Sequence, residues 1–89
     1  MSNTLQKQLL LDGAKIIEDP GRWTGGALKR RKKVCAVGAM YLVGKQLRLT
    51  PKEVNNILGE SRRDDIIRIN DREGREAVIA HMRELATQL

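Results

Sequence analysis

Signals that begin and end helices recur along this chain and divide it into short helical segments. The clearest lies at 50–53, where Thr50 caps a helix, Pro51 suits its first position and Glu53 completes a capping box. Apolar residues follow at helical spacing, and Gly59 is a natural stop. This segment therefore predicts a helix over residues 51–58.

Similar signals predict helices along the rest of the chain. Asn3 and Gln6 can form a capping box for the first helix, and Pro20 helps to end it. Asn70, with Glu73 three residues later, predicts the cap of the last helix. The predicted helices span residues 3–17, 34–49, 51–58, 61–69 and 70–89. No strand pattern competes, so we expect an all-α single domain over 1–89, with four to five helices.

The first, second and last of these helices are expected to form the core. Trp23 and Tyr41 are the only aromatic residues of the 89. Leu, Ile, Val, Ala and Met must therefore fill the interior. The same scarcity argues against nucleic-acid modules that stack bases on several aromatic side chains.

Basic charge gathers between the first two predicted helices. The chain has 17 Lys plus Arg and 11 Asp plus Glu. Without the six cations of this segment, basic and acidic residues are equal in number. The six are Arg22, Lys29, Arg30, Arg31, Lys32 and Lys33. Such a patch attracts anionic partners, with nucleic acid the first candidate, through phosphate contacts that do not read sequence. A solvated loop with no partner is the alternative.

Trp23 lies in the same Gly-rich loop and has two interpretations. It can lock the loop onto the core, as large aromatic side chains commonly do. Otherwise it is an exposed anchor for a binding partner, because Trp is enriched at interface hot spots. The first interpretation is favoured.

The segment 51–69 has the outline of a helix-turn-helix. Arg62 and Arg63, however, are followed at once by Asp64 and Asp65, which neutralise them and repel phosphate. Two packed core helices are the preferred interpretation.

Cys35 and His81 raise the possibility of thiol chemistry. Cys35 falls near a predicted helix start after two lysines, where a thiolate is stabilised, and Asn70 or Asp71 can orient the histidine. A cysteine among small apolar residues is more often a packing residue. A single His and a single Cys cannot build a zinc site, and no acidic run has calcium-loop spacing. We expect no enzyme, no metal and no cofactor.

Three motifs resemble a small uncharacterised helical family of bacterial, mainly actinobacterial, and phage proteins. They are the Trp-x-x-Gly-Ala loop in 21–28, the Cys-Ala-x-Gly-Ala helix in 35–39, and Asn70-Asp71 before the last helix. The resemblance implies a compact helical fold of unknown function. The basic run 29–33 is heavier than expected for that family.

The function expected from the residues is a non-enzymatic binding protein that uses the loop 22–33 against nucleic acid or a nucleoprotein. The alternative is an accessory or inhibitor protein of the kind phages use, acting on a host protein complex. One cysteine, no visible signal peptide and no long apolar run favour a cytoplasmic protein without membrane contact. The oligomeric state stays open.

Overall fold

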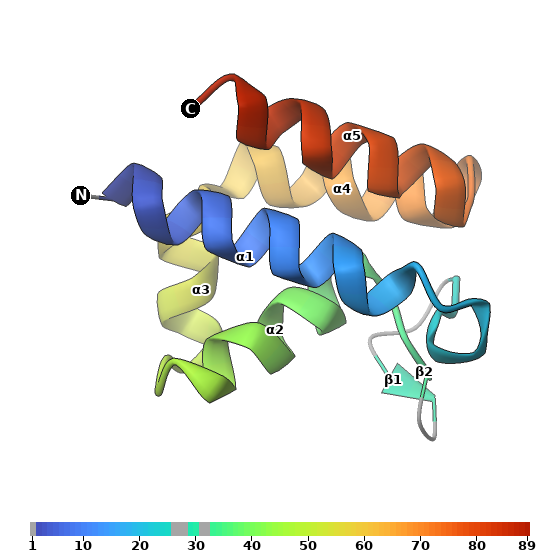
Figure 1. The fold of residues 1–89 in the computed structure, drawn as a ribbon, viewed down its shortest axis with the longest axis horizontal. Helices are drawn as coiled ribbons and strands as arrows, with labels where there is room; N and C mark the ends of the chain where they lie inside the picture. Colours follow the sequence, from blue (N-terminus) through green and yellow to red (C-terminus); the bar gives the residue numbers. More distant parts are fainter. Residues whose placement is uncertain (1, 26–28, 31–32) are drawn as a thin grey trace.

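Helices form nearly all of the regular structure of this protein. The structure is a computed structural model, and it describes residues 2–25, 29–30 and 33–89. Within these ranges lie the helices α1 (Ser2–Ile17), α2 (Ala36–Gln46), α3 (Pro51–Leu58), α4 (Glu60–Arg72) and α5 (Arg75–Thr87) (Figure 1). The predicted all-α class is confirmed.

α1 is the central helix of the fold. It lies between α2 on one side and α5 on the other and packs most extensively against these two (Figure 1). Aliphatic and methionine side chains fill the interior, with Leu9 and Ile17 of α1, Met40 of α2 and Met82 of α5 fully buried. The prediction that the first, second and last helices form the core is confirmed.

The signals at the two ends of α3 act as predicted. The backbone N–H of Glu53 donates to Thr50 Oγ1 at 3.2 Å, and the N–H of Thr50 donates to Glu53 Oε1 at 3.0 Å. These bonds to Thr50 hold the pKa of the Glu53 carboxyl below its usual value. Gly59 has φ +88°, a backbone conformation that favours glycine, and separates α3 from α4.

Two other predicted caps are wrong. α1 already includes Ser2, so Asn3 lies inside the helix, and the Gln6 amide instead donates to the carbonyl of Ile57 at 2.7 Å. This bond ties α1 to α3. Asn70 lies inside α4, which continues to Arg72. α5 begins after Gly74, at Arg75.

The sequence predicts a loop or a short helical turn between α1 and α2, and the structure shows a turn together with two short strands. A 3-10 turn, η1 (Pro20–Arg22), follows α1. Two very short strands, β1 (Lys29–Arg30) and β2 (Lys33–Val34), then pair in antiparallel fashion before α2. Val34, placed at a helix start by the sequence, therefore belongs to a strand and is buried.

Close packing of α2 against α3 gives a stability prediction. A Cβ at Gly44 would overlap Cγ2 of Val54, a stiff and fully buried side chain. The overlap costs about 1–3 kcal/mol, while removing a helical glycine returns up to about 1 kcal/mol. We therefore expect Gly44→Ala to lower the free energy of unfolding by about 1–2 kcal/mol in urea denaturation.

The matched control is Gln46→Ala, an exposed change on the same helix. It should shift the free energy of unfolding by less than about 0.5 kcal/mol. A Gly44→Ala protein as stable as the wild type would show that α3 is not held this close to α2.

Candidate nucleic-acid interface

One buried side-chain amide anchors the segment that carries the basic residues. Asn70 of α4 is 1% exposed. Its Oδ1 accepts hydrogen bonds from the Trp23 indole N–H at 2.8 Å and from the Ala36 backbone N–H at 3.0 Å. Its Nδ2 donates to the Thr24 carbonyl at 3.4 Å and to Asp71 Oδ1 at 3.1 Å. Asn70 thus joins α4 to both ends of the connection between α1 and α2.

Trp23 is half-buried and packs against the hydrophobic core. Its only polar group, the indole N–H, is already bonded to Asn70. The prediction that Trp23 locks the loop onto the core is confirmed. Because its side chain is bonded to Trp23 in the loop, Asn70 does not cap the last helix.

Backbone pairing brings basic positions from three stretches of chain together. Trp23 bridges Val34 in parallel, and the Thr24 N–H donates to the Val34 carbonyl at 3.0 Å. Arg22 and Lys33, the residues just before this bridge, are therefore neighbours along adjacent backbones. On the other side of β2, Arg30 is the Cα partner of Lys33. Pairing residues of like charge across strands is unfavourable.

The predicted site residues divide into three groups in the structure. Arg22 and Lys33 are exposed side chains at the base of the segment. Lys29 and Arg30 form β1. Arg31 and Lys32 lie outside the described residues.

No ion pair in the described part of the chain includes Arg22 or Lys33. Within the described ranges the pairs join Arg63 to Asp64, Arg68 to Asp65 and Arg83 to Glu18. All three lie on the helices or at the end of α1.

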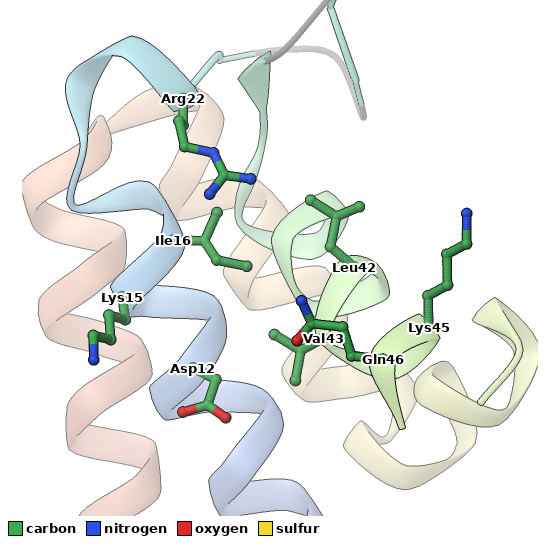
Figure 2. A pocket seen from close by; sticks show the side chains of 8 residues that line it. All are labelled: Asp12, Lys15, Ile16, Arg22, Leu42, Val43, Lys45 and Gln46. Carbon is green, nitrogen blue, oxygen red and sulfur yellow. The ribbon is translucent and has the colours of Figure 1, made fainter. Parts of the chain in front are cut away.

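Arg22 also lies at the edge of a hollow between α1 and α2. Figure 2 shows its guanidinium over the space between Ile16 and Leu42. The open hollow has a volume of about 860 Å³. Its lining consists of Asp12, Lys15, Ile16, Arg22, Leu42, Val43, Lys45 and Gln46. Sequence reasoning missed Lys15 and Lys45, because they lie on different helices and only the packing of α1 on α2 brings them to one hollow.

The arginines of the helix-turn-helix candidate make bonds within the protein. Arg63 Nε donates to the Tyr41 hydroxyl at 3.4 Å, which raises the pKa of the Arg63 guanidinium. The Tyr41 hydroxyl donates in turn to Asn55 Oδ1 at 2.8 Å, and Arg62 donates to the Leu58 carbonyl. These bonds join α2, α3 and α4, in keeping with the interpretation of two packed helices.

Cys35 and His81 are not joined in the structure. The buried Cys35 is the N-cap of α2, and its Sγ accepts a hydrogen bond from the Gly38 N–H at 3.4 Å. The structure describes both residues and shows no hydrogen bond between them. Asn70, one of the two residues proposed to orient the histidine along with Asp71, has its amide bonded to Trp23, Thr24 and Ala36.

The chain has no match among family models, curated proteins or solved structures. The resemblance to a helical bacterial and phage family therefore stays a prediction, and its supposed Asn70-Asp71 cap lies inside α4. Among the described residues, no cluster of three or more His, Cys, Asp or Glu has the arrangement of a metal site. No helix in the same ranges combines the length and hydrophobicity needed to span a bilayer.

The anchoring role of Asn70 gives a second prediction. Asn70→Ala leaves the buried N–H of Ala36 and the Trp23 indole N–H without their acceptor, at about 1–3 kcal/mol for each group. We expect the free energy of unfolding to fall by about 2–4 kcal/mol. The emission of Trp23, the only tryptophan, should shift to longer wavelength as the indole becomes solvated.

Asn56→Ala is the matched control, because Asn56 is exposed on α3. It should leave both the urea midpoint and the Trp23 emission unchanged. If Asn70→Ala also leaves both unchanged, the segment is held on the core by other contacts.

Proposed function

We propose that this protein is a non-enzymatic binding protein that holds nucleic acid, free or within a nucleoprotein, on the basic segment 22–33. The observation that carries the proposal is the pairing of cationic positions on adjacent backbones at Arg22, Lys33 and Arg30. Repulsion among them is relieved by a polyanion that runs along the segment.

The distribution of charge supports the same conclusion. On the helices, arginines such as Arg63 and Arg68 have acidic neighbours within ion-pair distance. The exposed side chains of Arg22 and Lys33 have no such neighbours within the described ranges. A localised field of this kind steers association with polyanions and fades with added salt.

The anchoring of the segment supports binding at small entropic cost. Trp23 and Val34 fix its two ends on the core, and Asn70 bonds on both sides of it. Less chain freedom is then lost when the phosphates bind. Phosphate contacts carry no base information, so we expect binding to be largely independent of sequence.

Fluorescence anisotropy with labelled DNA and RNA across a salt series tests the proposal. The wild type should bind with a slope of log K against log salt of about −3 to −5, as three to five phosphate contacts predict. A variant with Lys29, Arg30, Arg31, Lys32 and Lys33 all changed to Gln should lose at least tenfold in affinity at low salt and most of the slope.

A control variant with the same loss of net charge separates the effect of the segment on affinity from the effect of net charge. It changes five exposed helix cations to Gln: Lys7, Lys52, Arg62, Arg68 and Arg72. This control should keep the slope and remain within about threefold of wild-type affinity, since the segment 22–33 keeps all its cations and the nucleic acid loses only long-range attraction. No binding by the wild type at low salt, or equal losses in the two variants, would overturn the proposal.

A further inference from the structure

A second, apolar hollow lies beside the basic one. It has a volume of about 260 Å³ and is formed where α2 meets β2 and the start of α3. Its lining consists of Val34, Gly38, Tyr41, Leu42, Lys45, Leu49 and Pro51. Lys45 is the only charged residue of this lining, and the pocket is smaller than the roughly 300–1,000 Å³ of small-molecule sites. Its size and character suit one large apolar side chain.

The hydroxyl of Tyr41 is hydrogen-bonded within the protein. This hydroxyl donates to Asn55 and accepts from Arg63, so the ring presents its apolar part to the hollow. A side chain that enters the hollow therefore finds no free Tyr41 hydroxyl to bond with. A nucleobase, whose edges carry hydrogen-bonding groups, is poorly matched to such a lining.

The apolar and basic hollows adjoin each other on α2. Leu42 and Lys45 line both of them, and the two hollows are together called the groove below. Lys15, Arg22 and Lys45 stand around the larger hollow, with Asp12 as the single acid in its lining (Figure 2). An apolar pocket thus adjoins a surface with excess positive charge.

We propose that this groove docks an acidic amphipathic segment of a partner protein. One large apolar side chain of the segment enters the hollow between Tyr41, Leu42 and Leu49. Its carboxylates, one or two turns further along, lie against Lys45, Arg22 and Lys15. Charge complementarity selects the acidic partner, and the apolar pocket fixes its register.

This surface goes beyond the proposed nucleic-acid site and is tested by different residues. A protein that carries both surfaces can hold a nucleic acid on segment 22–33 and an acidic segment of a bound protein in the groove. Arg22 lies between the two and is left unchanged in the experiments.

The test is a titration of the isotope-labelled protein with a synthetic peptide, followed by amide NMR shifts. The peptide has about a dozen residues, with two Leu spaced four apart among Glu and Asp, which places both Leu on one helix face. Shifts should concentrate at Leu42, Lys45 and Leu49. A second peptide with Ser in place of both Leu, and a third with Gln in place of every acid, should each bind at least fivefold more weakly.

Variants of the protein test peptide binding to the groove, and each has a matched control. Leu42→Ser should weaken binding about tenfold, as the loss of one buried apolar contact of about 1.4 kcal/mol predicts. Leu11→Ser, on the exposed side of α1, should have no effect. Lys45→Gln should weaken binding about two- to fivefold, as for one exposed ion pair, while Lys7→Gln should not. Because Lys45 is exposed, its variant keeps the test valid if Leu42→Ser is poorly folded.

Three results would overturn the proposal. The first is an absence of shifts at millimolar peptide. The second is an oligonucleotide that shifts Leu42 and Leu49 as strongly as the peptide does, which would assign the groove to nucleic acid. The third is a dimer in sedimentation that Leu42→Ser dissociates, which would assign it to a second copy of this chain.

Discussion

The carboxamide of Asn70 is the interaction on which the connection between α1 and α2 depends. One oxygen accepts from Trp23 and Ala36, and the nitrogen donates to Thr24, all from a side chain that is 1% exposed. No hydrocarbon side chain can replace it, because the N–H groups it satisfies are themselves removed from water. In the connection, Val34 and Cys35 are buried, and this amide adds hydrogen bonds to their packing.

This anchor holds basic positions of the connection close together despite the repulsion between their charges. Backbone pairing places position 30 opposite Lys33 and brings Arg22 beside Lys33, and like charges on paired strands are unfavourable. The bonds of Asn70 and the burial of Val34 offset this cost.

Local signals predicted most of the helices correctly. The predictions that failed are those in which contacts between residues far apart in the sequence decide the structure. Thr50 and Glu53 form their capping box because both partners lie within one turn, where nothing competes. Asn70 and Glu73 have the same spacing as Thr50 and Glu53. The Asn70 oxygen, however, accepts a hydrogen bond from Trp23, which is far away in the sequence, and α4 continues beyond Asn70. Lys15 and Lys45 were likewise missed, since no periodicity relates two residues whose only link is the packing of α1 on α2.

The two aromatic residues are both held by hydrogen bonds within the protein. The indole N–H of Trp23 is bonded to Asn70, and the hydroxyl of Tyr41 lies between Asn55 and Arg63. Both rings are therefore tied to the structure through their polar ends. In the two binding proposals above, recognition rests on cations and on aliphatic surface. Cations bind any polyanion, whereas the pocket beside Leu42 selects by shape, and a partner that satisfies both gains a specificity that neither surface has alone.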